Sequence, residues 1–154
     1  MSDVVIRSAG AADLPAVAEL RWRWLEQARG TPDVDLADFV PRFVAWGREN
    51  TASHHCFVAV RGEAVIGMAW LAVTPRVPYP DAFDRASGDV QCVYLLPEHR
   101  DGGLGGRLVE AVLALAGELG LERVSVHSND RAVAAYSRYG FAVSPRLLQA
   151  VPGA

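Results

Sequence analysis

Apolar residues recur along this chain with two periods, one typical of helices and the other of strands. Two amphipathic helices are predicted first, from Leu14 to about Gly30 and from about Asp35 to Arg48. Asp13 and Pro15 supply the cap and the first-turn proline that commonly begin a helix. The apolar stripe of the second helix has the spacing i, i+3, i+4, i+7, i+8 and consists of Leu36, Phe39, Val40, Phe43 and Val44.

Shorter runs with β-branched and aromatic residues predict strands. Five are predicted over residues 4–7, 55–61, 64–73, 90–96 and 123–127, and two final strands over residues 141–143 and 147–150. Two more helices are predicted, one from a glycine-rich turn to about Gly120 and one from Asn129 to Tyr139, closed by Gly140. This order of elements predicts an α/β domain in which helices cover a mixed sheet. The length suits one domain, to which we assign residues 1–154.

The composition and charge of the chain argue against some classes of function. Apolar residues make up 51% and charged residues 21%, and the net charge is −3. Without a basic excess, we expect no nucleic-acid partner. No apolar run reaches the length of a membrane span and the first residues do not resemble a signal peptide, so we expect no membrane partner. Cys56 and Cys92 lie in apolar runs, so we expect them to be buried free thiols and not a disulfide. Free thiols are typical of the reducing cytoplasm, where we expect this protein.

The segment DVQCVYLLPEHRDGGLGGRL predicts a buried strand, a glycine-rich turn and the start of a helix. The first amides of a helix lack partners within the helix, and glycines let a ligand approach the backbone, so such a turn binds anions such as phosphate. The chain has no lysine for a Walker loop. The third glycine of a dinucleotide fingerprint would fall at Leu108, which disfavours a nucleotide-binding oxidoreductase. A helix entry without any ligand is the structural alternative.

Two motifs in this half of the chain resemble those of GNAT acetyltransferases. Arg100-x-x-Gly103-x-Gly105 is similar to the Arg/Gln-x-x-Gly-x-Gly/Ala signature of that family. About 25 residues later, the segment from Asn129 to Phe141 matches the pattern Asn-x-x-Ala-x-x-x-Tyr-x-x-x-Gly-Phe. The resemblance implies a GNAT-type acyl-CoA N-acyltransferase fold, with a mixed, mostly antiparallel sheet of six to seven strands and about four helices. It also implies that acetyl-CoA is used and that a primary amine attacks its thioester directly.

The resemblance assigns roles to particular residues. Amides of the glycine loop would hold the pyrophosphate of coenzyme A, the Leu95 amide would face the thioester carbonyl, and Leu96 would border the pantetheine. The full cofactor-binding set is Leu95, Leu96, Arg100, Asp101, Gly102, Gly103, Leu104, Gly105, Gly106 and Asn129. Tyr136 would be the general acid and Asp89 the base. Purely structural roles stay open: a helix cap for Asn129, a core residue for Tyr136 and a solvated carboxylate for Asp89.

Other assignments rest on less specific patterns. His99 and His127 are alternative bases, and the contiguous triplet His54-His55-Cys56 lacks the spacing of zinc ligands, so we predict no metal. A non-catalytic acyl-CoA-binding or regulatory domain with the same fold is the alternative function.

The acceptor would be a small-molecule amine or a peptide amine. Its predicted surroundings are Trp22, Trp24, Trp46, Tyr79 and Phe83, with Asp33, Asp35 and Asp81 as charges that attract a cation. An exposed edge or C-terminal strand would support a homodimer.

Overall fold

The computed structural model describes residues 3–153 and has a five-stranded sheet at its centre. The strands lie in chain order, and only the last pair, β4 and β5, is parallel. Their bounds are β1 Val4–Ser8, β2 His54–Arg61, β3 Ala64–Pro75, β4 Ala86–Leu95 and β5 Val124–Val126.

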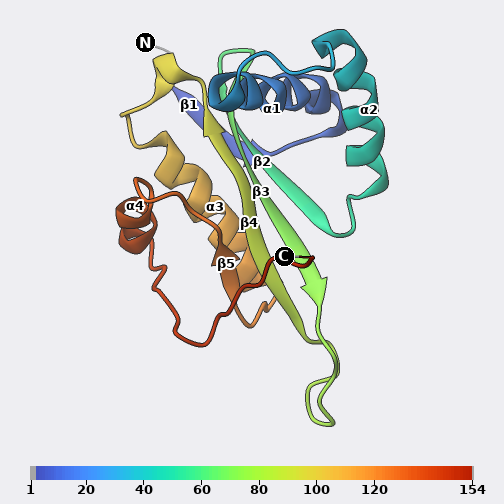
Figure 1. Ribbon diagram of the computed structural model, residues 1–154, viewed down its shortest axis with the longest axis vertical. Helices are drawn as coiled ribbons and strands as arrows, with labels where there is room; N and C mark the ends of the chain where they lie inside the picture. The colour runs from blue at the N-terminus through green and yellow to red at the C-terminus, as the bar shows by residue number, and fades with distance from the viewer. Residues whose placement is uncertain (1–2, 154) are drawn as a thin grey trace.

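Helices cover both faces of this sheet (Figure 1). Helices α1 (Leu14–Arg29) and α2 (Leu36–Glu49) lie on one face, and α3 (Leu104–Glu118) lies on the other, with the short α4 (Val133–Arg138) beside it. Two short 3-10 turns, Ala11–Asp13 and Pro97–His99, precede α1 and the glycine loop. The predicted α/β architecture with four helices is therefore confirmed.

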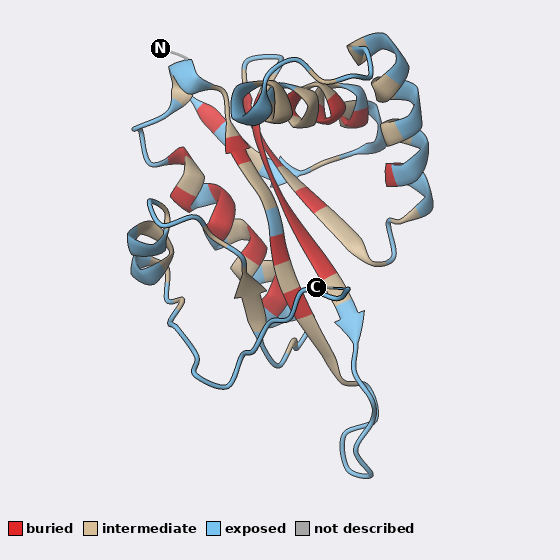
Figure 2. Cartoon of the chain, viewed as in Figure 1, coloured by how far each residue is buried: buried red, intermediate tan, exposed pale blue. Residues whose placement is uncertain are grey.

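The core consists of two layers, one on each side of the sheet. Alternation along β3 directs Met68 and Trp70 toward α1, and Ala69 and Leu71 toward α3. The buried positions in Figure 2 follow the strands and the inner faces of α1 and α3. Burial of these apolar side chains is the main force that holds the helices on the sheet.

The prediction of six to seven strands was wrong, because the described residues form five. Residues 141–143 and 147–150 form no strand, and Val143, Leu147 and Leu148 are exposed. Each run is short enough to make few ladder hydrogen bonds, and Pro145 between them lacks an amide donor. Helix α4 is also shorter than predicted, because the chain forms turns over residues 130–132 before the helix begins.

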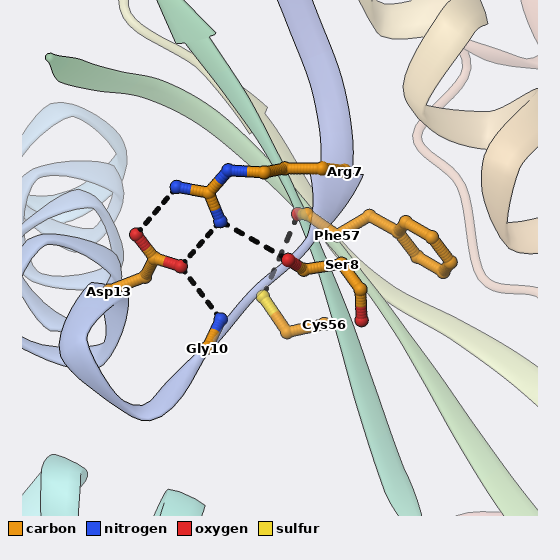
Figure 3. Close-up of polar contacts among 6 residues, drawn as sticks. All are labelled: Arg7, Ser8, Gly10, Asp13, Cys56 and Phe57. Carbon is orange, nitrogen blue, oxygen red and sulfur yellow. Dashed lines mark hydrogen bonds and ion pairs between the residues drawn. The ribbon is translucent and has the colours of Figure 1, made fainter.

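An ion pair fixes the connection from β1 to α1 (Figure 3). The Arg7 guanidinium contacts both carboxylate oxygens of Asp13, at 2.6 and 3.0 Å, and the Gly10 amide donates to the same carboxylate at 2.7 Å. The hydrogen bond from Arg7 is the main reason that the pKa of Asp13 lies below its usual value. The Asp13 carboxylate therefore links β1 to the loop that leads into α1.

Candidate active site

Strands β4 and β5 stay paired over only a short distance. Gly88, Asp89 and Val90 pair with Val124, Ser125 and Val126, after which β5 ends while β4 continues to Leu95. From Gln91 onward, the edge of β4 that faced β5 has no partner strand among the described residues. Backbone donors and acceptors along this edge are available to a ligand.

A β-bulge shapes the same part of β4. Met68 pairs with Tyr94 and Trp70 pairs with Gln91, so Cys92 and Val93 together lie opposite one residue of β3. Cys92 has a φ of 56°, which a non-glycine residue adopts only when its surroundings impose it. The bulge therefore redirects the end of β4.

The amide of Leu95 points toward the open edge. The neighbouring Leu96 amide donates to the Ile66 carbonyl at 2.9 Å, and successive strand amides point in opposite directions. The carbonyl of Leu95 accepts a hydrogen bond from Nε of Arg100 at 3.0 Å. The Arg100 side chain also reaches Gln27 in α1, at 3.3 Å, so it ties the loop to β4 and α1.

The glycine loop turns through two residues with left-handed backbone, Asp101 (φ 69°) and Gly103 (φ 80°), and α3 begins at Leu104. A β-carbon at Gly102 or at Gly103 would meet no atom within 4 Å, so the space over the loop is open. The first amides of α3 have no partner within the helix, and the positive end of its dipole lies there. This arrangement fits a phosphate or a pyrophosphate.

The loop and the open strand edge lie against each other. A β-carbon at Gly105 would lie 3.8 Å from Cδ1 of Leu95. Leu104 is only 6% exposed and packs in the core, so it offers a ligand its backbone alone. Leu96 is half-buried and packs against both core layers. The structure therefore brings together the strand residues and the loop residues of the predicted cofactor set.

Helix α4 packs beside the same loop. A β-carbon at Gly106 would lie 2.6 Å from the phenolic oxygen of Tyr139, so the Tyr139 ring covers the first turn of α3. Tyr136 is half-buried and meets Phe141 edge to face, with ring centroids 5.5 Å apart. Burial, and then Tyr139, raise the pKa of Tyr136 above its usual value, so its phenol is protonated at neutral pH.

Tyr136 lines a hollow of about 630 Å³ between β5, α4 and the C-terminal segment. Asn129 lies just before α4, and its side-chain oxygen accepts a hydrogen bond from the Ala132 amide at 2.9 Å. Asn129 therefore has the structural role of ordering the turn before α4, and its role toward a cofactor stays a prediction.

Comparison with known proteins identifies the family. The sequence model of the acetyltransferase (GNAT) family matches residues 14–141, which include both motifs. The chain belongs to the acetyltransferase (GNAT) family. No curated protein sequence matches this GNAT chain significantly.

Solved acetyltransferase structures share the fold of this GNAT chain. A predicted acetyltransferase from Clostridium acetobutylicum, solved with acetyl-CoA, is 16% identical with a TM-score of 0.78, over 97% of this chain and 96% of that one. An acetyltransferase from Trypanosoma brucei is 21% identical with a TM-score of 0.74, over 97% and 99%. Glucosamine-6-phosphate N-acetyltransferase from Arabidopsis thaliana is 17% identical with a TM-score of 0.74, also over 97% and 99%. GNAT proteins use acetyl-CoA and act on amine acceptors.

In this GNAT chain, Asp89 lies on the sheet face that α1 and α2 cover. It pairs in register with Ala72, two residues from Trp70, which packs in the core layer beneath α1. Its carboxylate accepts a hydrogen bond from the Gln91 side chain at 2.9 Å. Asp89 is half-buried. Within residues 3–153, no hydrogen bond joins the side chains of Asp89 and Tyr136.

The histidine side chains of the GNAT chain contact other residues or solvent. Nδ1 of His99 lies 2.6 Å from Nη1 of Arg61, and His127 is exposed. His54 contacts the Ser53 hydroxyl at 2.7 Å and stacks edge to face on Trp46. Over the described range 3–153, no group of three or more His, Cys, Asp or Glu side chains is arranged to hold a metal ion. No helix in that range is long and apolar enough to cross a membrane.

The structure separates the aromatic residues that were predicted to surround the acceptor. Trp46 packs with Phe43 and Trp70 on the α1–α2 face. Tyr79 and Phe83 lie in the loop between β3 and β4, which projects past the rest of the molecule (Figure 1). Phe83 is 76% exposed, and Tyr79 stacks on Arg85 of its own loop. Tyr79 and Phe83 therefore lie apart from the aromatic cluster on the α1–α2 face.

Sequence reasoning missed three residues of this region. The contact of Tyr139 with Gly106 could be inferred only from spatial proximity. The hydroxyl of Tyr94 is buried and has no hydrogen-bond partner among the described residues. Arg21, in α1, was also missed, although an arginine among the apolar positions of an amphipathic helix was a signal that could have found it.

Proposed function

We propose that this GNAT chain is an N-acetyltransferase, which transfers the acetyl group of acetyl-CoA to a primary amine by direct attack. The observation that supports this most is the meeting of the open β4 edge, with its outward Leu95 amide, and the amide-rich start of α3. The β4 edge offers hydrogen bonds to the arm that carries the thioester, and the start of α3 binds an anion. An acyl-CoA requires both, because it has a thioester arm and a pyrophosphate.

The cofactor would lie along these two elements. Backbone amides from Gly102 to Gly106 would hold the pyrophosphate, and Arg100 would keep the loop against β4 through the Leu95 carbonyl. Leu95 and Leu96 would border the pantetheine, and Asn129 would close the site from the α4 side. Asp101 and Leu104 would contribute their backbones.

Acetyl-CoA, when bound, supplies an acetyl group activated as a thioester. The acceptor amine must be neutral to attack, and the Asp89 carboxylate would take its proton. The Leu95 amide would donate a hydrogen bond to the carbonyl oxygen as negative charge develops there. As the new C–N bond forms and the C–S bond breaks, the Tyr136 phenol would give a proton to the leaving thiolate. The phenolate would then take up the second proton that the attacking nitrogen loses as it becomes an amide. The products are the acetylated amine and free coenzyme A.

A non-catalytic acyl-CoA-binding domain would use the same strand edge and loop. The protonated, half-buried phenol of Tyr136 favours the enzyme, because binding alone requires no acid at this position. A homodimer and a cytoplasmic location stay predictions, and light scattering of the purified protein would measure its mass in solution.

The proposal is tested by thiol release from acetyl-CoA with a panel of amines, amino acids and short peptides. Tyr136→Phe should lower turnover at least tenfold while the dissociation constant for acetyl-CoA stays the same. Tyr79→Phe removes the same hydroxyl from the exposed loop and should change neither. Acetyl-CoA binding without release for any acceptor would favour the binding domain instead.

A further inference from the structure

Helix α1 has an arginine on the side that faces the sheet. Leu14, Val17, Arg21 and Trp24 follow one another at spacings of three and four residues, so they share one stripe of the helix. Leu14 and Val17 are buried, and Arg21 and Trp24 are half-buried. An apolar side chain at position 21 would continue the stripe, so packing against the core does not explain why this position holds a charged residue.

The protein itself leaves this cation without an anion. The guanidinium of Arg21 lies 4.4 Å above the ring of Trp24. Among residues 3–153, Arg21 makes no salt bridge and no side-chain hydrogen bond. Two residues later, the exposed Arg23 pairs with Glu19 at 2.9 Å. Arg21 also lies in the middle of the helix, so the dipole at the C-terminus does not compensate its charge.

The stripe with Arg21 packs on the core layer to which the bulge of β4 belongs. Trp24 and Cys92 pack against the same core layer between α1 and the sheet. Burial raises the pKa of the Cys92 thiol, the charge of Arg21 lowers it, and the charge of Asp89 raises it. Both charges therefore act on the Cys92 thiol, Arg21 from α1 and Asp89 from β4.

We propose that Arg21 binds an anionic group of the acceptor, a carboxylate or a phosphate, while the amine of the same molecule lies near Asp89. This inference rests on the proposed function, because it assigns a second contact to the substrate of that reaction. The planar guanidinium offers two parallel donors that match either anion, and its stacking on Trp24 keeps it oriented. The preferred acceptors are thus amines that also carry an anionic group, such as an amino acid or an amino-sugar phosphate.

Matched acceptor pairs test this assignment. One pair is an amino acid and its carboxamide, and the other is glucosamine 6-phosphate and glucosamine. For at least one pair, the wild type should have a kcat/KM about tenfold or more higher for the anionic member, since a charge-assisted hydrogen bond has that effect. The pair that shows the preference distinguishes carboxylate from phosphate.

Arg21→Gln should abolish that preference through KM, Arg21→Lys should keep part of it, and the dissociation constant for acetyl-CoA should not change. Arg23→Gln, on the same helix, is the matched control and should keep the full preference. Equal rates for both members of each pair, or an equal loss for both in Arg21→Gln, would overturn the proposal. Weaker acetyl-CoA binding in Arg21→Gln would overturn it too, because Arg21 would then serve the cofactor.

Calorimetry separates this inference from the proposed function. If a folded protein binds acetyl-CoA but acetylates no acceptor, the proposed function fails. Titration of the same acceptor pairs into wild type and Arg21→Gln still measures whether Arg21 binds the anionic member. Tighter binding of the anionic member by the wild type alone would support the anion site, and identical binding would overturn it.

Discussion

Tyr139 occupies the space beside Gly106, so that a β-carbon at position 106 would lie 2.6 Å from the phenolic oxygen. This contact joins α4, which includes Tyr136, to the first turn of α3, where the pyrophosphate is proposed to bind. A side chain as small as a methyl group at position 106 therefore changes the position of the α4 segment relative to the loop.

We expect Gly106→Ala to weaken acetyl-CoA binding and to lower the free energy of unfolding by about 1–3 kcal/mol, because Tyr139 must move. Isothermal titration and urea denaturation measure the two effects. Gly117→Ala is the matched control in the same helix, since no atom lies within 4 Å of the β-carbon it adds. It should be neutral or stabilising. Gly106→Ala combined with Tyr139→Ala should recover binding, and no recovery would show that the contact does not position the loop.

The Asp89 carboxylate is predicted to take the proton of the acceptor amine. Asp89→Asn keeps the size of the side chain and its hydrogen-bonding to Gln91 but removes the base, so kcat should fall about a hundredfold. The KM for acetyl-CoA should change little. Asp84→Asn, in the exposed loop between β3 and β4, should leave both constants unchanged. An active Asp89→Asn enzyme would assign the proton to another group, such as His127 or water.

The two thiols should differ in reactivity. Burial raises the pKa of both Cys56 and Cys92, so both react slowly with iodoacetamide near pH 7.5. Cys92 is half-buried at the bulge while Cys56 is buried, so Cys92 should be alkylated first, as peptide mass spectrometry would show. Acetyl-CoA should slow the alkylation of Cys92 if it binds along β4. Faster alkylation of Cys56 would contradict the described burial.

The Arg7–Asp13 pair predicts how stability depends on pH. The pKa of Asp13 is lower in the folded protein than in the unfolded chain, where it is about 4. Its contribution is therefore complete above that value and is lost as the pH falls through the lower folded pKa. Asp13→Ala should lower the free energy of unfolding by on the order of 1 kcal/mol at pH 7.

Urea denaturation of the wild type and Asp13→Ala at several pH values would check this dependence. The difference between the two proteins should shrink between about pH 5 and pH 2. Asp84→Ala should show a small difference throughout that range. A difference between wild type and Asp13→Ala that does not depend on pH would mean that the ion pair does not form in solution.

Local signals in the sequence determined most of the elements that build the candidate site. The stripes of α1 and α2, the apolar run of β4 and the glycine turn before α3 all depend on neighbours within a few residues of each other. The two GNAT motifs likewise identified the family, because each combines strand, turn and helix signals at fixed spacing. Gly140 was correctly predicted to close α4, since a positive φ favours glycine at that position.

Tertiary structure alone decided which of these residues meet. The open edge of β4 exists because β5 has three residues and ends at Val126, and the sequence pattern predicted a longer strand. The runs at 141–143 and 147–150 have strand-like composition but find no partner, because pairing depends on a neighbouring strand in space. The contact of Tyr139 with Gly106, and the packing of Trp24 in α1 and Cys92 in β4 against one core layer, likewise join residues far apart in the chain. Packing of side chains from distant segments determines such contacts, and a pattern of near neighbours contains no information about it.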